Sequence, residues 1–201
     1  MFENSTILIT GGTGSFGRAF TSMTFSKYNP RKIIIFSRDE MKQWDMQQDY
    51  LNEDRIRFLL GDVRDKERVY RAFKDVDYVI HAAANKIVPL AEKDPFECIK
   101  TNIDGAKNII NAAIDNQVKR IIALSTDKAS SPANLYGATK MVSDNLFINA
   151  NRYAGKQDSL FSVVRYGNVM GSRGSIIPLF FKLSQNEKNY LPITDPEMTR
   201  F

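Results

Sequence analysis

The sequence has very few residues that form disulfides or bind transition metals. Its 201 residues include one cysteine, Cys98, and one histidine, His81. One cysteine cannot form an intrachain disulfide, and the two residues together cannot supply the four thiolate or imidazole ligands of a structural zinc site. We therefore expect no metal site and a reducing, cytoplasmic environment.

Long apolar runs and runs of like charge are also absent. No segment approaches the roughly 18 consecutive apolar residues of a membrane span, and the N-terminus leads into a strand-like run at residues 6–10 without a signal-peptide pattern. The net charge is +5, but the 28 Lys and Arg are scattered among 23 Asp and Glu. Nucleic-acid binding requires clustered positive charge. We expect neither a membrane span nor a nucleic-acid partner, but a small phosphorylated ligand.

What the sequence does contain is an alternation of short apolar runs and longer amphipathic segments. The runs are rich in Val, Ile and Leu and lie at residues 6–10, 32–36, 56–60, 77–83, 120–125 and 160–166. The segments between them are long enough for helices, and apolar residues recur at helical spacing in residues 95–116. This pattern predicts a doubly wound α/β fold of Rossmann type, with a parallel sheet buried on both faces. Ligands of such a fold bind beyond the carboxyl ends of the strands.

The last part of the chain departs from this pattern. We expect the main domain to span residues 1–166, while residues 167–201 lose the strict alternation and contain Pro192 and Pro196. The sequence stops just after the turn-like segment ITDPE at residues 193–197. This ending predicts a fragment that is cut at its C-terminus.

The first strand-like run leads into a glycine-rich segment, TGGTGSFG at residues 10–17. Glycine permits a tight turn and lets a pyrophosphate approach the backbone N–H groups at the start of the following helix. We expect a dinucleotide to be bound here by Gly11, Thr13, Gly14, Ser15, Phe16 and Gly17. The alternative is a tight turn with a structural role only.

The end of the second run indicates which dinucleotide binds. Ser37 and Arg38 come first and are followed by Asp39 and Glu40. Arg can bind the 2′-phosphate of NADP with two hydrogen bonds, whereas an acid would accept from the ribose 2′-OH of NAD. The order favours NADP over NAD. The alternative is that Arg38 is a solvated charge and Asp39 binds the ribose.

After the third run, the segment GDVRD at residues 61–65 places two side chains where an adenine could lie. Asp62 would accept from the adenine amino group, and Val63 would pack on the ring. The alternative is a simple turn followed by a helix cap at Asp65.

The spacing Tyr-x-x-x-Lys, which places both side chains on one face of a helix, occurs three times. The pairs begin at Tyr28, Tyr70 and Tyr136. The first straddles a proline before a strand, and the second lies in a helix without a polar strand end nearby. Only the third follows a buried strand that ends in hydroxyl and charged groups, LSTDK at residues 124–128. There Lys140 would lower the pKa of Tyr136, which could take a proton from a substrate hydroxyl; the alternative is a buried Tyr beside a surface Lys.

Five segments together resemble one family. They are TGGTGSFG, HAAANK (81–86), LSTDK, YGATK (136–140) and RYGNVMGSRGS (165–175). The whole chain is similar to the extended short-chain dehydrogenases/reductases, most closely to the UDP-N-acetylglucosamine 4,6-dehydratase (5-inverting) group, whose members serve pseudaminic acid and capsule sugar synthesis in bacteria. Members of this group continue past Phe201. The resemblance therefore implies that residues 167–201 only begin a nucleotide-sugar-binding part.

The resemblance implies NADP-dependent dehydration of UDP-N-acetylglucosamine, or a related UDP-hexose, to a UDP-4-keto-6-deoxy-N-acetylhexosamine with inversion at C5. Thr126 would hydrogen-bond O4, and Tyr136 with Lys140 would drive oxidation at C4. Lys128 would then remove the C5 proton that the 4-keto group acidifies, and Asp127 would protonate the departing O6. An adjacent acid and amine suit these two roles, because their surroundings can make their pKa values differ, so that one group donates a proton and the other accepts one.

The residue type at position 128 distinguishes the alternative functions. The resemblance implies that retaining dehydratases carry Asp-Glu where this chain has Asp127 and Lys128, and that epimerases lack the acid–base pair. A UDP-sugar 4-epimerase is the second enzyme hypothesis, and a cofactor-binding domain without activity is the third. The alternative for Lys128 itself is a solvated turn lysine, with Asp127 as a helix cap.

The resemblance also implies further contacts. Two alanines would lie at the cofactor, Ala82 and Ala83, and three residues at the substrate, Asn168, Arg173 and Arg200. Lys86 either faces the substrate or lies on the surface. His81 either tunes the surroundings of the cofactor or is a packed, hydrogen-bonded residue. Cys98 is expected to pack as a small apolar side chain. A homo-oligomer is expected.

Overall fold

The chain divides into two compact units. In the computed structural model, the described residues are 2–155, 158–185, 191–193 and 195–197. The units are Met1–Arg165 and Tyr166–Phe201. The first contains the sheet and the helices that pack on it, and the second has one helix among its described residues.

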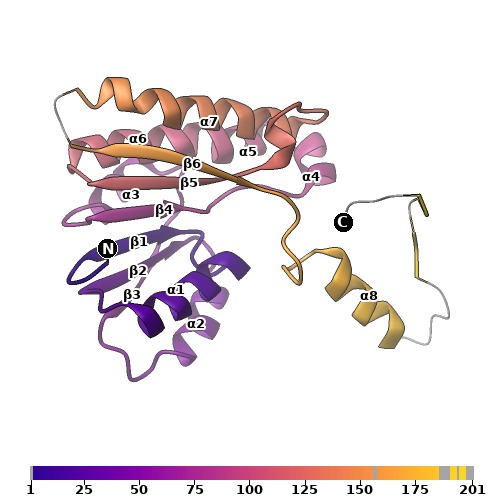
Figure 1. Cartoon of the computed structure of the whole chain (residues 1–201), viewed down its shortest axis with the longest axis horizontal. Coiled ribbons are helices and arrows are strands. Elements are labelled where there is room, and N and C mark those ends of the chain that lie inside the picture. The colour runs from indigo at the N-terminus through magenta and orange to yellow at the C-terminus, as the bar shows by residue number, and fades with distance from the viewer. Residues whose placement is uncertain (1, 156–157, 186–190, 194, 198–201) are drawn as a thin grey trace. The chain divides into compact units, whose positions relative to one another are not determined.

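The first unit is built on a six-stranded sheet (Figure 1). The strands are β1 (Thr6–Thr10), β2 (Lys32–Ser37), β3 (Ile56–Leu60), β4 (Tyr78–His81), β5 (Arg120–Thr126) and β6 (Leu160–Tyr166). Their order is β3-β2-β1-β4-β5-β6, and the strand pairs from β3 to β5 run parallel. The predicted doubly wound sheet is confirmed, and its strand order reverses between β1 and β4, where such sheets bind ligands. β4 is shorter than predicted because Ala82 and Ala83 leave the strand and continue as a loop.

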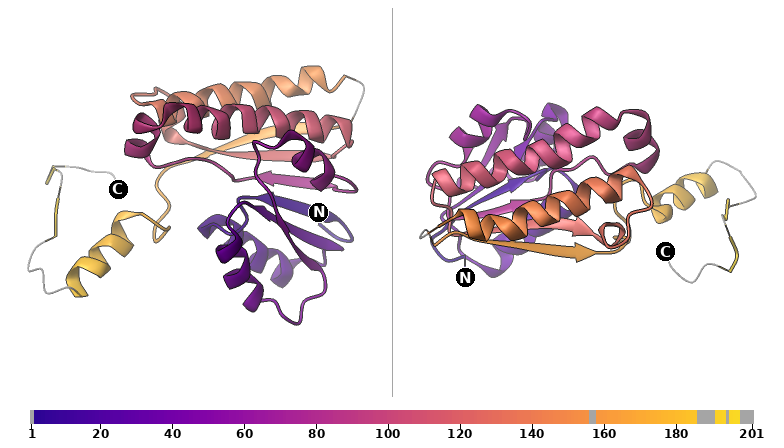
Figure 2. Two further views of the ribbon diagram at one scale, coloured as in Figure 1. Left: turned by 180° about the vertical axis from the view of Figure 1, so that it is seen from behind. Right: turned by 90° about the horizontal axis from the view of Figure 1, so that it is seen from above.

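Helices cover both faces of this sheet. Those of the first unit are α1 (Ser15–Lys27), α2 (Glu40–Gln48), α3 (Lys66–Ala72), α4 (Val88–Lys93), α5 (Pro95–Ile99), α6 (Gly105–Asp115) and α7 (Leu135–Tyr153). Side chains alternate along a strand, so Ile7 and Ile9 of β1 pack with Met46 of α2 on one face. Leu8 packs on the other face in a cluster that includes Phe147 of α7. Over that face α6 and α7 lie side by side (Figure 2, right).

Residues 95–116 are helical as predicted, but they are interrupted. A π-helical turn, η1 (Lys100–Asp104), separates α5 from α6. It turns Asn102 inward, where its Nδ2 donates to the carbonyl oxygen of Asn85 and to Oγ1 of Thr139, both at 3.0 Å. The Oδ1 of Asn102 accepts from the backbone N of Asn85 over 2.8 Å. An apolar period of 3.6 residues does not reveal a π turn, yet this one holds the loop that follows β4.

The second unit contains a helix that the sequence analysis did not predict. This is α8 (Ile176–Gln185). It follows two glycines with positive φ angles, Gly171 at 70° and Gly174 at 79°. The run IIPLFF at residues 176–181 is apolar throughout and therefore hides the helical period. No helix in the described part of the chain is long and apolar enough to cross a membrane.

Two adjacent residues of α7 allow a test of this packing. Phe147 is fully buried, whereas Ile148 is 55% exposed. We expect Phe147→Ala to lower the free energy of unfolding by about 3–5 kcal/mol, because it leaves a cavity in the core. Ile148→Ala should change it by only about 0.5 kcal/mol. Urea denaturation followed by circular dichroism measures both, and equal losses would contradict the assigned face of α7.

Candidate active site

The glycine-rich loop between β1 and α1 is closely packed at two of its glycines. Gly11 has a φ angle of +64°, and a Cβ there would lie 2.9 Å from the Cα of Ala83. A Cβ on Gly17 would lie 2.2 Å from the carbonyl oxygen of Gly12. The first turn of α1 after Gly14 has neither a side-chain cap nor an acidic residue. Its N–H groups and dipole therefore suit an anion such as a pyrophosphate, and the loop fits a dinucleotide.

Ser37, at the end of β2, lies under this loop. Its hydroxyl is buried and accepts from Oγ1 of Thr13 at 3.4 Å and from Nε2 of Gln43 at 3.2 Å. Gln43 also donates to the carbonyl oxygen of Ser37 over 2.9 Å. Both contacts use the hydroxyl oxygen as acceptor, so Ser37 can still donate its proton.

The charged residues after β2 have different uses. Arg38 is exposed, and its guanidinium lies 3.7 Å from a carboxylate oxygen of Asp62. Asp39 caps α2 by accepting from the backbone N of Lys42 at 3.0 Å, and it also ion-pairs with the Lys42 ammonium. Asp39, which the NAD alternative assigns to the ribose, is thus engaged in the fold. The Arg38 side chain is 55% exposed, so its guanidinium is accessible to a ligand at this strand end.

The segment after β3 is similarly tied to the fold. Burial acts to raise the pKa of Asp62, but hydrogen bonds from Arg64 outweigh it and lower the pKa. The Val63 side chain is 4% exposed and packs in the core. Asp65 caps α3 by accepting from the backbone N of Arg68 at 2.9 Å, as the alternative interpretation expected. The adenine contacts of Asp62 and Val63 stay predictions.

Thr10 and His81 form a buried pair at the ends of β1 and β4. Oγ1 of Thr10 lies 2.7 Å from Nδ1 of His81 and accepts from the backbone N of Ala82 and of Ala83, each at 3.2 Å. Because those two N–H groups occupy the acceptor sites of the hydroxyl, its proton points to Nδ1, and the imidazole carries its own proton on Nε2. Burial, and then the charge of Lys140, lower the pKa of His81 to about 3. His81 is the packed, neutral residue of one alternative, and the pair holds the backbone at Ala82 and Ala83.

Tyr136 and Lys140 lie in the first turns of α7, which Asn134 caps by accepting from the backbone N of Gly137 at 2.9 Å. Lys140 is 3% exposed, and its Nζ donates to the carbonyl oxygen of Leu124 over 2.8 Å. Burial lowers the pKa of Lys140 to about 8. An ammonium in this place can lose its proton near neutral pH, and while charged it favours an ionised phenol one turn away.

The other two Tyr-x-x-x-Lys pairs do not share a helix face. α1 ends at Lys27, before Tyr28, and Lys32 starts β2. The sequence analysis placed the pair that starts at Tyr70 within one helix, and this was wrong at its second member. α3 ends at Ala72, because the residues after it turn toward β4.

The segment after β5 brings an acid, an amine and a hydroxyl together. Oγ1 of Thr126 donates to Oδ1 of Asp127 at 3.0 Å and accepts from the backbone N of Lys128 at 3.3 Å. Nζ of Lys128 donates to the same Oδ1 at 3.2 Å. Thr126, and not Asp127, therefore caps the 3₁₀ turn η2 (Asp127–Ala129), which corrects the capping alternative.

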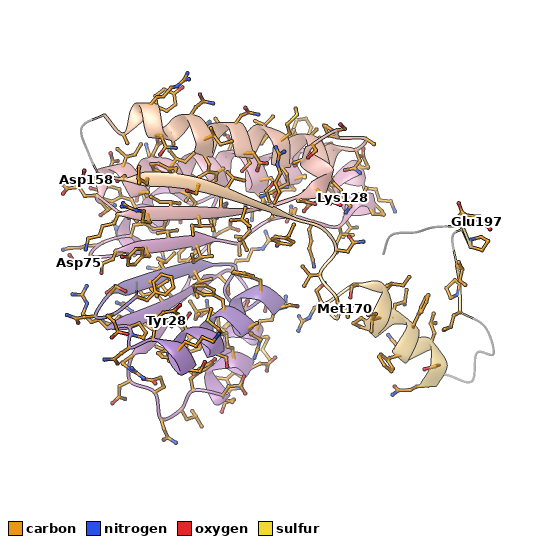
Figure 3. All side chains as sticks on the ribbon, in the orientation of Figure 1. Tyr28, Asp75, Lys128, Asp158, Met170 and Glu197 are labelled. Atoms are coloured by element: carbon orange, nitrogen blue, oxygen red, sulfur yellow. The ribbon has the colours of Figure 1, made fainter. Side chains whose placement is uncertain are left out.

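Charge and exposure in this segment favour an ion pair. Desolvation acts to raise the pKa of Asp127, but the hydrogen bonds from Thr126 and Lys128 outweigh it and lower the pKa. The side chains of Asp127 and Lys128 are 51% and 40% exposed. Figure 3 shows Lys128 at the edge of the sheet where β5 ends, opposite the edge that carries Asp75 and Asp158. The pair is therefore open to a ligand at the carboxyl edge.

Gly137 is a site residue that the sequence analysis missed. A Cβ at this position would lie 2.5 Å from the carbonyl oxygen of Lys128. The first turn of α7, which carries Tyr136, thus packs directly on η2. The glycine within YGATK, at the start of a helix that has no need of one, was the available indication.

The remaining predicted residues lie on other segments of the chain. Lys86 is exposed on the loop after β4. Asn168 and Arg173 belong to the second unit, and Arg200 lies outside the described residues. Cys98 is buried as predicted, although its sulfur also lies 3.7 Å from Oγ1 of Thr139. Among the described residues, no group of three or more His, Cys, Asp or Glu could hold a metal ion.

Comparisons with known proteins agree with this geometry. The chain is 59% identical over its whole length to a UDP-N-acetylglucosamine 4,6-dehydratase (inverting) of Campylobacter jejuni and covers 60% of that protein. It is 50% identical to a UDP-glucose 4-epimerase of Rickettsia bellii, covering 100% of this chain and 59% of the relative. The crystal structure of Pen from Bacillus thuringiensis superposes with a TM-score of 0.95 at 41% identity, covering 100% of this chain and 62% of Pen.

The chain thus spans about 60% of the length of the curated relatives that it matches. The resemblance drawn from the five sequence segments is confirmed by the C. jejuni relative. The family of polysaccharide biosynthesis proteins matches residues 7–201. The chain therefore belongs to the polysaccharide biosynthesis protein family.

Proposed function

We propose that this chain carries the cofactor-binding and catalytic part of an NADP-dependent dehydratase. The enzyme converts UDP-N-acetylglucosamine to a UDP-4-keto-6-deoxy-N-acetylhexosamine with inversion at C5. The observation that supports this most directly is the Asp127–Lys128 pair, hydrogen-bonded to Thr126 at the end of β5 and packed against the turn of α7 that carries Tyr136. The C. jejuni relative with this activity in its name is 59% identical.

The cofactor site is proposed on the loops at the carboxyl ends of β1 to β4. The loop of residues 11–17 would hold the pyrophosphate, Arg38 the 2′-phosphate, and Asp62 with Val63 the adenine. Ala82 and Ala83 would border the dinucleotide beside the loop. When bound, a nicotinamide would accept hydride from C4 of the sugar and return it at C6, so that the cofactor is regenerated in each turnover.

The first chemical task of the chain is to remove the proton from O4. Tyr136 would take this proton while Thr126 holds O4 by a hydrogen bond. The charge of buried Lys140, whose Nζ is held by the carbonyl oxygen of Leu124, would stabilise the phenolate. Oxidation at C4 acidifies the proton on C5.

The second task is loss of water across C5 and C6. At rest, Asp127 and Lys128 form an ion pair, and the hydrogen bonds from Thr126 and Lys128 lower the pKa of Asp127. A bound sugar that excludes water would favour proton transfer within the pair, because burial disfavours charge. One proton then passes from Nζ of Lys128 to Oδ1 of Asp127. Lys128 takes the C5 proton and Asp127 gives its proton to the departing O6, so the pair returns to its resting state. A solvent proton then enters C5 from the opposite face, which inverts that carbon, and Tyr136 releases to solvent the proton that it took from O4.

Residues 167–201 are proposed to begin the nucleotide-sugar part. Asn168 and Arg173 would contact the diphosphate, Arg200 the nucleotide, and Lys86 the sugar. These contacts are carried over from the family resemblance. A second candidate function is a UDP-sugar 4-epimerase, since the R. bellii relative has that name at 50% identity. That reaction leaves O6 in place and has no need of Lys128.

The deciding experiment is incubation of the purified protein with UDP-N-acetylglucosamine in D₂O, followed by NMR and mass spectrometry. A 4-keto-6-deoxy sugar with deuterium at an inverted C5 would support the dehydratase. A C4 epimer that keeps O6 would establish the epimerase. Bound NADP without any reaction would indicate that these 201 residues bind cofactor only.

The role of Lys128 as the base at C5 can be tested by removing its amine. Lys128→Ala should lower deuterium exchange at C5 by at least about 100-fold, because a proton-transferring group contributes roughly that much. Cofactor binding should be unchanged. Lys107→Ala is the matched control, since Lys107 is another exposed lysine that ion-pairs with an acid, Asp104. Unchanged exchange in Lys128→Ala would disprove the assigned role.

Arg38 should determine the preference for NADP. A charge-assisted hydrogen bond contributes roughly 1.5–3 kcal/mol, so Arg38→Ala should raise the Kd for NADP by about 10- to 100-fold and leave that for NAD nearly the same. Isothermal titration calorimetry with both dinucleotides measures this, with Arg57→Ala as the control. An equal loss of affinity for both dinucleotides would contradict a contact with the 2′-phosphate.

The lowered pKa of Lys140 predicts a pH dependence. The amine is charged below a pKa of about 8 and loses its charge as the pH rises through that value. The rate of oxidation at C4, measured within a single turnover as transient nicotinamide reduction at 340 nm, should therefore fall above about pH 8. Lys140→Met should lower the rate by about 100-fold and remove this decline. A decline of the same midpoint in Lys140→Met would assign it to another group.

A further inference from the structure

Arg165 joins three segments of the first unit around the candidate site. It lies on β6, and its Nε donates to Oδ2 of Asp144 on α7 over 2.8 Å. Its Nη1 donates to Oγ of Ser130 at 3.2 Å, in the loop just after η2. None of the proposed chemical steps uses these three residues. The contacts therefore need another explanation.

The buried carboxylate of Asp144 stabilises this set of contacts. Its side chain is 2% exposed, so the carboxylate would be costly to leave without a partner. Arg165, which is 41% exposed, satisfies it and is held in one orientation by it. A planar guanidinium can serve two acceptors at once, and here the second acceptor is Ser130.

Ser130 also contacts the turn that carries Asp127, the acid of the site. The backbone N of Ser130 donates to the carbonyl oxygen of Asp127 over 3.0 Å. On the other side of the same turn, the carbonyl of Lys128 lies against Gly137. The turn that carries Asp127 and Lys128 is thus held between α7 and the side chain of Arg165.

Asp144 is also connected to the other half of the site. Tyr136, Lys140 and Asp144 follow one another at intervals of four residues and so lie on one face of α7. The negative charge of Asp144 opposes the lowering of the Lys140 pKa by burial. The charge of Lys140 also adds to the lowering of the pKa of the buried, neutral His81 imidazole.

We propose that Asp144, Arg165 and Ser130 form a positioning bridge, which sets the place of the Asp127–Lys128 turn relative to Tyr136 and Lys140. Two proton transfers at neighbouring sugar carbons require both pairs to fit one bound substrate. A displacement of about 1 Å can cost roughly 100-fold in rate. This catalytic consequence rests on the proposed function, but the bridge itself does not.

Hydrogen exchange in the chain without ligands tests the bridge directly. Ser130→Ala removes the weaker contact and keeps the buried ion pair, while Arg165→Lys keeps the charge but cannot bond both acceptors. One lost hydrogen bond corresponds to roughly a three- to tenfold change in local opening. We expect exchange of residues 126–134 to rise by about that factor in both variants, and exchange of α6 to stay the same.

The chain offers matched controls for both changes. Arg31 likewise joins an acid, Asp77, to a hydroxyl, that of Thr6, so Arg31→Lys makes the same change elsewhere. Ser26→Ala removes an exposed serine hydrogen bond from α1. Neither control should alter exchange of residues 126–134. Unchanged exchange there in both bridge variants, or an equal rise throughout the first unit, would overturn the proposal.

A second measurement separates the bridge from the proposed function. In the D₂O assay, Ser130→Ala should slow exchange at C5 by about tenfold and nicotinamide reduction by less than about twofold, because Tyr136 and Lys140 keep their places on α7. An equal loss in both steps would contradict a positioning role. If the unmodified chain shows neither step, the proposed function fails, while the hydrogen-exchange result still decides on the bridge.

Discussion

The hydrogen bond from the ammonium of Lys140 to the carbonyl oxygen of Leu124 is the contact on which the candidate site depends. It joins α7, which carries Tyr136, to β5, which ends in Thr126. A buried ammonium without a hydrogen-bond partner destabilises the fold, so movement of α7 away from β5 is unfavourable. The missing Cβ of Gly137 then lets the same helix rest on the turn that follows β5. The reactive groups are placed by this packing rather than by their own short segment.

The acidic residues that follow the strands have different roles in the fold. Asp39 and Asp65 each cap the helix that follows them, and their oxygens satisfy backbone N–H groups. Asp127 occupies a similar place after β5, but Thr126 takes over the capping there. Its carboxylate accepts from the side chains of Thr126 and Lys128 and is half exposed, so it is accessible to a ligand.

Much of the fold and some of the site could be predicted from the sequence. Buried parallel strands leave continuous runs of Ile, Val and Leu, which is why all six strands were placed within a few residues. The interrupted helix at residues 100–104 and the helix α8 were not foreseen. In the first case the apolar period continues across the π turn, and in the second an unbroken apolar run has no period to find.

The sequence by itself determined the order of strands and helices, the glycine loop, and the identity of the acid, the amine and the phenol, because these depend on local pattern and on residue type. Only the structure decided that the pair that starts at Tyr70 does not share a helix, and that His81 is neutral. It also decided that Arg165 reaches both Asp144 and Ser130. Burial and contacts between residues far apart in the chain set these properties, and no short segment of the sequence specifies either of them.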